Sequence, residues 1–361
     1  MPPELKTVPT PAANLAEGER LMTICNACRY CEGYCAVFPA MERRLTFSAA
    51  DLRYLANLCH NCAECYYACQ YAPPHEFAVN VPQVFARIRA DSYRQYAWPS
   101  TFAKIFGHGK WVLWILGMAA IAASVRNIGG RLFYEVIPHE WMVAIFLAVS
   151  AFILAAHVAG FLRFWSDAGE RLARFLQPPV LLKAARDVLA LTNLSSGGAG
   201  CTYPDEHHSQ ARRLFHHLTF YGFLLCFAST TIAAIDHLLG DIAPHPYLSA
   251  PVILGTLGGI GLLIGPCGLF LLKRKRDSAI ADASQDMSDK SFLRLLALTS
   301  ATGLMLLVLR ETSAMGLLLV VHLAVVLLLF LTLPYGKFVH GIYRSAALVK
   351  SALETQHQSR S

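Results

Sequence analysis

The sequence is poor in charge, and its first twenty residues contain no apolar run. Charged residues make up 15% of the 361 residues, hydrophobic residues make up 55%, and the mean hydropathy is +0.41. This composition is too apolar for a soluble protein of this size and predicts several membrane spans. The first twenty residues are polar, so no cleavable signal peptide is expected. The net charge of +7 is carried by basic residues beside apolar runs, which favours a lipid bilayer and not nucleic acid as the partner.

Six apolar stretches follow one another from about residue 110 onward, and most reach the roughly 20 residues that a helix needs to cross a bilayer. They lie near 110–127, 141–164, 214–238, 250–272, 293–309 and 314–336. An even number of spans puts both ends of the chain on one side. The sequence therefore predicts a mainly α protein, in which residues 101–345 form a six-helix transmembrane bundle and 346–361 form a cytoplasmic tail.

Lysine and arginine are concentrated in alternate links between these stretches. The link 165–213 carries six of them, and the next link on the same side begins with the four basic residues 273–276. The opposite links, around 128–140, 239–249 and 310–313, contain fewer. By the positive-inside rule, both termini and the residues before the first span are cytoplasmic, which corresponds to the inner membrane of a bacterium.

Eight of the eleven cysteines form two runs of identical spacing. The runs are Cys25-x2-Cys28-x2-Cys31-x3-Cys35 and Cys59-x2-Cys62-x2-Cys65-x3-Cys69. This spacing is typical of bacterial two-cluster ferredoxins, in which the fourth cysteine of each run ligates the other cluster. We therefore assign one [4Fe–4S] cluster to Cys25, Cys28, Cys31 and Cys69, and the second to Cys59, Cys62, Cys65 and Cys35.

Structural zinc is the alternative for these cysteines. Zinc sites built from four cysteines use two separate C-x2-C pairs, and a third cysteine at the same spacing is not expected. The usual proline after the fourth cysteine is replaced by Ala36 and Gln70.

Ser48 precedes an acidic first turn and resembles a helix N-cap. We expect a flexible tail over 1–15 and a helical, two-cluster ferredoxin-like domain over 16–100.

Histidines within or beside the apolar stretches are candidates for a further cofactor, because ionisable residues are costly in a membrane. They are His157, His216, His217, His237, His322 and His340. His322 and His340 are eighteen residues apart, so a continuous helix would present both on one face. A b-type haem takes one neutral imidazole on each axial side. We pair His340 with His216 or His217, which lie at a similar depth, and expect one haem b.

A second haem would need a partner for His322. His157 lies toward the inner half of its span and His237 ends a span on the outer side, so neither matches the depth of His322. Whether a second haem is bound therefore stays open.

The glycines of 250–272 predict close helix packing. The glycine-rich link before Cys201 is expected to be a flexible loop.

Three segments of the chain resemble the tricarballylate- or citrate-utilisation protein B family. They are residues 24–39, which contain the first cysteine run, 213–228, which contain the two adjacent histidines, and 333–344 at the end of the last span. The similarity covers nearly the whole chain from about residue 20. It implies an iron–sulfur and haem b membrane protein that reoxidises the reduced flavin of an FAD-dependent tricarballylate dehydrogenase.

The membrane part is also similar to the cytochrome b subunit of respiratory nitrate reductase. That subunit ends its final helix in a Pro-aromatic-x-basic-x-Val-His pattern, which residues 334–340 match, and this helix supplies two haem ligands. His322 and His340 match those positions. The other ligand helix carries two histidines in that subunit. Here His217 or His216 fits the first of them, whereas the second falls near a residue that cannot ligate.

These features together predict a relay from a reduced flavoprotein through two clusters and haem b to quinone. The glycines of 250–272 lack the strand and acid of a dinucleotide site, so the flavin is expected to belong to the partner. One alternative is a quinol-oxidising module that feeds a cytoplasmic reductase. Another is a carboxylate transporter with a redox-sensing iron–sulfur domain, for which inverted repeats and broken helices would be expected. The intramembrane His322 argues against a purely structural anchor.

Overall fold

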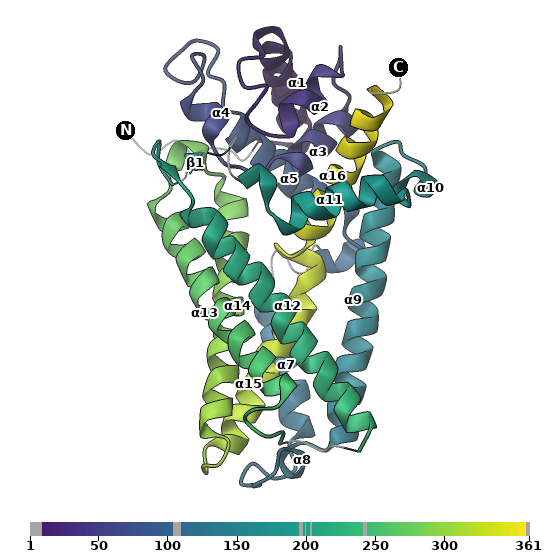
Figure 1. Ribbon diagram of the computed structural model, residues 1–361, viewed down its shortest axis with the longest axis vertical. Coiled ribbons are helices and arrows are strands. Elements are labelled where there is room, and N and C mark those ends of the chain that lie inside the picture. Colours follow the sequence, from purple (N-terminus) through teal and green to yellow (C-terminus); the bar gives the residue numbers. More distant parts are fainter. Residues whose placement is uncertain are drawn as a thin grey trace.

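The protein is a bundle of long helices with a cap of short helices over one end (Figure 1). The computed structural model describes residues 9–103, 110–194, 198, 200–202, 204–240 and 244–358. Parts of the expected tails and of the expected flexible link lie outside the described residues, namely 1–8, 359–361, 195–197 and 199.

The cap and the bundle are both helical. The cap contains α1 (Pro11–Cys28), α2 (Val37–Glu42), α3 (Ala49–Leu58), α4 (Glu64–Tyr67) and α5 (Val81–Tyr96). The bundle contains α7 (Lys110–Ser124), α9 (His139–Asp167), α12 (Ala211–Leu238), α13 (Ala250–Lys275), α14 (Ala283–Leu309) and α15 (Met315–Thr332), and α16 (Val339–Gln358) returns into the cap. The connections contain α8 (Phe133–Val136), α10 (Leu172–Phe175), α11 (Pro178–Leu189), η1 (Thr192–Leu194), η3 (Ser278–Ile280) and η4 (Leu333–Tyr335). Strands β1 (Cys201–Thr202) and β2 (His208–Ser209) form one antiparallel pair.

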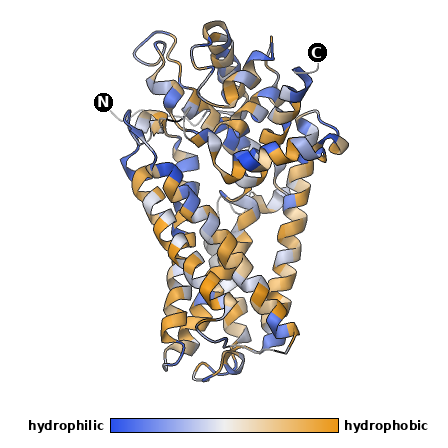
Figure 2. Cartoon of the chain, viewed as in Figure 1, coloured by the Kyte–Doolittle hydropathy of each residue, from blue (hydrophilic) through white to orange (hydrophobic). Residues whose placement is uncertain are grey.

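Five helical segments of the described chain are long and apolar enough to cross a membrane. They are α9, α12, α13, Gln285–Leu309 within α14, and the segment Met315–Gln358. Figure 2 shows hydrophobic residues along the bundle and more hydrophilic residues in the cap. The mainly α fold is thus confirmed. The expected span near 110–127 corresponds to α7, whose 15 residues extend only about 22 Å, so the count of six spans is approximate.

Side-chain caps set the starts of two cap helices. The Ser48 hydroxyl accepts from the Asp51 backbone N–H, and the Asp51 carboxylate accepts from the Ser48 backbone N–H. This capping box confirms the N-cap expected at Ser48. Thr10 caps α1 in a similar way, and Pro11 occupies the first turn. Helix α1 therefore begins inside the segment 1–15 that we expected to be a flexible tail.

The last apolar stretch is not one continuous helix. Helix α15 ends at Thr332, η4 follows, and α16 begins at Val339. Pro334 has no backbone N–H to donate and its ring crowds the preceding turn, which ends the α-helix there. The five-turn spacing that put His322 and His340 on one face assumed an unbroken helix, and it does not hold across this interruption.

Helix α16 belongs to the hydrophobic core of the cap. Ala347 and Leu353 are buried, and they lie in the same core cluster as Phe85 of α5 and Trp165 of α9. The segment 346–361, expected to be a cytoplasmic tail, is therefore helical to residue 358 and packed between the cap and the bundle. Its apolar residues supply the reason, since they repeat on one face of the helix.

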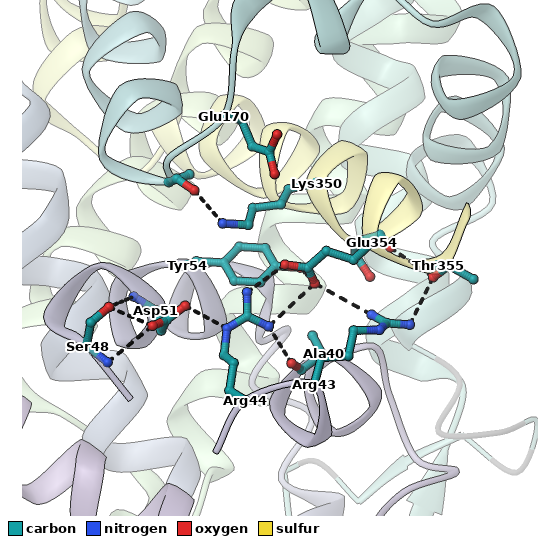
Figure 3. A network of polar contacts seen from close by, with 12 residues as sticks. Ala40, Arg43, Arg44, Ser48, Asp51, Tyr54, Glu170, Lys350, Glu354 and Thr355 are labelled. Atoms are coloured by element: carbon teal, nitrogen blue, oxygen red, sulfur yellow. Dashed lines mark hydrogen bonds and ion pairs between the residues drawn. The ribbon is translucent and has the colours of Figure 1, made fainter. Parts of the chain in front are cut away.

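A partly buried ion-pair network fixes the end of α16 to the cap (Figure 3). Arg44 contacts Glu354 of α16 at 2.6 Å and Asp51 of α3 at 2.6 Å. The hydroxyl of Tyr54 donates to the same glutamate at 3.2 Å. Arg43 adds a hydrogen bond to the Thr355 hydroxyl at 3.1 Å. One helix thus connects the cysteine-bearing cap with the membrane bundle.

Helices α12 and α13 pack backbone against backbone. A Cβ atom on Gly261 would lie 2.9 Å from the Leu218 carbonyl oxygen, and one on Gly258 would lie 2.8 Å from the Cys226 nitrogen. Only glycine permits such an approach. The close packing expected from the glycines of this stretch is present, and it holds the N-terminal half of α12 in place.

Candidate cofactor sites

The thiols of the cap surround two neighbouring cavities. The first, of about 30 Å³, is lined by Cys25, Cys28, Cys31, Cys69 and Cys65. The second, of about 10 Å³, is lined by Cys35, Cys59, Cys62 and Cys65. The grouping follows the two crossed ligand sets expected from the spacing, and Cys65 lies at the boundary. None of the eleven cysteines forms a disulfide in the described chain, and no three His, Cys, Asp or Glu side chains within the described ranges are close enough to hold a single metal ion.

Backbone N–H groups point at the sulfur atoms of these thiols. The Asn61 backbone N–H donates to Cys59 Sγ at 3.3 Å. The fourth cysteine of each run also accepts backbone N–H hydrogen bonds. Those to Cys35 come from the two residues that open α2, and those to Cys69 come from Tyr71 and Ala72. Such donors stabilise thiolates and tune clusters. These backbone N–H donors therefore fit cluster ligation.

The bare thiols resist ionisation in this environment. Burial, and then repulsion from the neighbouring thiols, raises the pKa of Cys25 and of Cys31 to about 12. Burial likewise raises the pKa of Cys35 and Cys65 well above the ordinary value. A group of thiols that must ionise together in a buried place needs compensating positive charge, which iron ions supply. The residues present fit two [4Fe–4S] clusters.

A larger cavity of about 330 Å³ lies below the second thiol cavity, where the bundle meets the cap. It is lined by residues of α11, α12, α13, α14 and α16. The aromatic and aliphatic part of the lining includes Phe220, Phe223, Leu224 and Phe292. The wall is therefore mainly apolar, as a pocket for a large planar cofactor must be.

His216 of α12 and His340 of α16 face each other in this cavity. Their ring centroids are 6.2 Å apart and their planes are at 79°. Metal–imidazole bonds of about 2 Å, with about 1.1 Å from each nitrogen to its ring centre, put two axial imidazoles about 6 Å apart. His340 Nδ1 contacts the Lys337 carbonyl oxygen at 2.5 Å, so this nitrogen carries the proton and leaves Nε2 as the ligand atom. His216 Nδ1 is buried without a partner.

Basic side chains are in excess around the same cavity. Its lining contains Arg212, Lys273, Lys337 and Arg344, against two carboxylates, Asp187 and Asp289. Asp289 contacts the lysine ammonium groups of residues 273 and 337, each at 2.9 Å. The remaining excess of two positive charges is the complement of the two propionates of a haem. The donor set and the lining thus fit one haem b.

The other candidate histidines lie elsewhere. His217 packs its ring on Tyr221, and His157 lies beside Phe338 with centroids 5.5 Å apart. His322 Nδ1 is 3.0 Å from the Thr302 hydroxyl in the α14–α15 contact. His237, at the opposite end of the bundle, stacks on His139 at 3.8 Å. The structure brings only the pair 216 and 340, of the six candidates, into the described cavity.

Three residues were not found from the sequence. His60 lines both the second thiol cavity and the larger cavity. Burial and the neighbouring Arg344 lower its pKa well below the ordinary value, so the ring is neutral. Arg212 and Arg344 donate to backbone carbonyls of residues 59–61. The available signal was the place of His60 between Cys59 and Cys62, and the spacing of each arginine, one turn from a candidate histidine.

Cys201, which follows the glycine-rich link, is fully buried. Its Sγ donates to the Leu194 carbonyl oxygen at 2.9 Å, and its side chain packs in one cluster with Cys62 and Ile280. The link is thus anchored against the second cysteine run at this point.

Two family models match the chain. The model described as Citrate utilization protein B matches residues 108–361, and that of the Citrate utilization protein B Fer4-like domain matches residues 18–98. A protein of Escherichia coli named Citrate utilization protein B is 47% identical over 353 residues, which cover 94% of this chain and 92% of that protein. No solved structure matches the chain.

Proposed function

The chain belongs to the citrate utilization protein B family, and we propose that it is a membrane electron-transfer protein. It reoxidises the reduced FAD of a partner tricarballylate or related tricarboxylate dehydrogenase. Two [4Fe–4S] clusters and haem b carry the electrons to membrane quinone. The Fer4-like domain supports the iron–sulfur part, and the five apolar helical segments support the membrane part.

The cysteine ligands are proposed as two crossed sets. Cys25, Cys28, Cys31 and Cys69 hold the first cluster, and Cys59, Cys62, Cys65 and Cys35 hold the second. When bound, each cluster accepts and donates one electron at a time. The protein supplies thiolates, backbone N–H donors to sulfur, and burial that limits access of water.

The haem ligands are proposed as His216 and His340. Helix α12 supplies one imidazole and α16 the other, and the Lys337 carbonyl oxygen orients the second ring. Arg212, Arg344 and the lysines of the cavity balance the propionates. His217 is proposed to have no ligand role, because it lies against Tyr221.

One observation carries the proposal: the second thiol cavity and the histidine-lined cavity share His60, so the cap and the bundle present adjoining sites. An electron donor must meet the cap, because the thiols lie there. The basic links support a cytoplasmic position for the cap, where a soluble flavoprotein is available. The hydrophobic bundle gives access to quinone in the membrane.

The test is anaerobic purification in mild detergent, followed by reduced-minus-oxidised spectra and iron and sulfide analysis. We expect a b-haem α-band and about eight irons beyond haem per chain, as two cubane clusters require. His216→Ala is expected to abolish the haem band, and His217→Ala, its matched neighbour, to keep it. Reduction of the haem by a reduced tricarballylate dehydrogenase tests the partner.

Other results would remove parts of the proposal. Zinc in place of iron would contradict the proposed electron-transfer function. A protein that contains the clusters but no haem would contradict the haem assignment. The carboxylate transporter would then be the leading alternative. Haem oxidation by the partner, with electrons drawn from quinol, would reverse the direction.

A further inference from the structure

The loop 59–62 separates the second thiol cavity from the cavity between the two histidines. His60 is the one side chain that appears in the linings of both, among the described residues. It is 5% exposed, and its Nδ1 lies 2.9 Å from the Leu58 carbonyl oxygen. The ring is therefore held by this contact between the two cavities that it lines.

The helices that carry the two histidines also hold this loop. Arg212 donates from Nη1 to the Asn61 carbonyl oxygen at 2.7 Å and from Nη2 to the His60 carbonyl oxygen at 2.9 Å. Arg344 donates to the Cys59 carbonyl oxygen at 2.7 Å. Each arginine is four residues, about one turn, from a histidine of the cavity. The loop and the imidazoles are thus fixed to the same two helices.

The first thiol cavity has no such connection. It shares Phe38, Cys65 and Val81 with the second cavity and no residue with the histidine cavity. Near it, Tyr30 and Phe77 are large exposed side chains, at 66% and 42%. The three cavities therefore follow one another from the surface of the cap to the edge of the bundle.

Resting on the proposed function, we propose that electrons leave the second cluster toward the haem through the ring of His60, and that the first cluster is the entry. Each step moves one electron: the second cluster is oxidised by one electron, the haem iron is reduced by the same electron, and no proton is taken up or released. His60 ligates neither cofactor. It fills the space between them with a rigid, conjugated ring in place of water or a flexible chain.

The test compares His60→Leu and His60→Phe in the full chain, mixed anaerobically with a reduced viologen while haem absorbance is followed. We expect a severalfold slower haem reduction in the leucine variant and partial recovery in the phenylalanine variant, with unchanged cluster spectra, haem content and haem potential. His75→Leu is the matched control, because His75 belongs to the same domain and lines neither cavity. Haem reduction at the original rate in a fully loaded His60→Leu protein would overturn the proposal.

A second measurement does not depend on His60 variants folding. Cys62→Ser removes a ligand of the second cluster and Cys28→Ser one of the first, and electron paramagnetic resonance identifies the cluster that remains. A viologen is a small donor that can also reduce the second cluster directly, so we expect haem reduction by viologen to be lost without the second cluster and retained without the first. The reverse order would overturn the inference. A wild-type chain without any haem would instead contradict the proposed function itself.

Discussion

Arg344 donates from Nη2 to the carbonyl oxygen of Cys59 at 2.7 Å, a bond that joins residues 285 positions apart. Arg344 lies in α16, one turn beyond His340, and Cys59 opens the second cysteine run. The bond ties the cap to the bundle at the point where their cavities adjoin. Two modules that look separate along the sequence are therefore one structural unit.

The loop should loosen when this bond is removed. In Arg344→Ala, the Cys59 carbonyl keeps its second donor, Arg89 Nη1 at 3.0 Å, so the cap is expected to fold. A buried hydrogen bond to a charged donor contributes about 1.5–3 kcal/mol. We expect the free energy that protects the second cluster from denaturant to fall by about this amount, measured as the shift of the cluster-bleaching midpoint in urea.

The control for that experiment is Arg174→Ala. Arg174 is about half exposed, and its ion pair with Glu170, one turn away in sequence, is 3.5 Å long. Exposed pairs of this kind contribute between about 0 and 1 kcal/mol. Equal midpoint shifts in the two variants would show that the bond of Arg344 to the loop has no particular role.

The glycine contact between α12 and α13 makes a second prediction. In Gly261→Ala, the new Cβ would lie 2.9 Å from the Leu218 carbonyl oxygen, so the helices must separate. Overpacking of this kind costs about 1–3 kcal/mol. Because α12 carries His216, we expect a lower thermal midpoint together with partial loss of haem. In Gly117→Ala, where the nearest atom is 4.0 Å away, the midpoint should stay or rise, since alanine favours a helix.

Part of the site follows from local spacing and part does not. The cysteine sets follow from the sequence because a tight C-x2-C-x2-C loop dictates which thiols converge, and they stay a prediction, although thiols of both runs line each of the two cavities. The choice between His216 and His217 could not, because adjacent residues point about 100° apart and only tertiary packing decides which one faces inward. The one sequence signal for His60 is its place between Cys59 and Cys62, and that place does not say which cavities its side chain lines.

The fold shows the same division. Apolar length, which depends on composition alone, predicted long apolar helices, and five helical segments of the described chain are long and apolar enough to cross a membrane. The interruption at Pro334 was visible in the sequence, yet the eighteen-residue spacing of two histidines favoured an unbroken helix. The docking of α16 into the cap was missed, because it depends on contacts such as that of Arg44 with Glu354, which join distant parts of the chain.

Acid should weaken the junction between α16 and the cap. Burial opposes ionisation of Asp51, but hydrogen bonds from Ser48 and Arg44 outweigh it and lower its pKa below the ordinary value. A lowered folded-state pKa stabilises the protein above the unfolded value, about 3.9 for aspartate, and this contribution is lost as pH falls through the folded pKa. We expect the thermal midpoint to decrease as the pH drops below about 4.

The matched variant is Asp51→Asn, which keeps a side-chain acceptor but removes the titrating group. Its thermal midpoint should be lower than that of the original chain at neutral pH, and the two should converge as the pH falls below about 4. Parallel curves with a constant offset at all pH values would contradict the assignment of this acid limb to Asp51.

The number of haems provides the last prediction, because it distinguishes the intramembrane histidine from the pair in the cavity. His322 Nδ1 is 3.0 Å from the Thr302 hydroxyl, and its ring packs on Gly303 of α14, where a Cβ would approach within 2.9 Å. The ring is therefore engaged in a helix contact, and it lies outside the lining of the cavity that His216 and His340 share. We expect His322→Leu to keep one haem per chain in a pyridine haemochrome assay, whereas His340→Leu should lose it. A helix-packing role predicts a lower thermal midpoint for His322→Leu, since the Thr302 hydroxyl loses a buried partner worth about 1 kcal/mol. Two haems in the original chain and one in His322→Leu would reverse this assignment and restore His322 as a ligand.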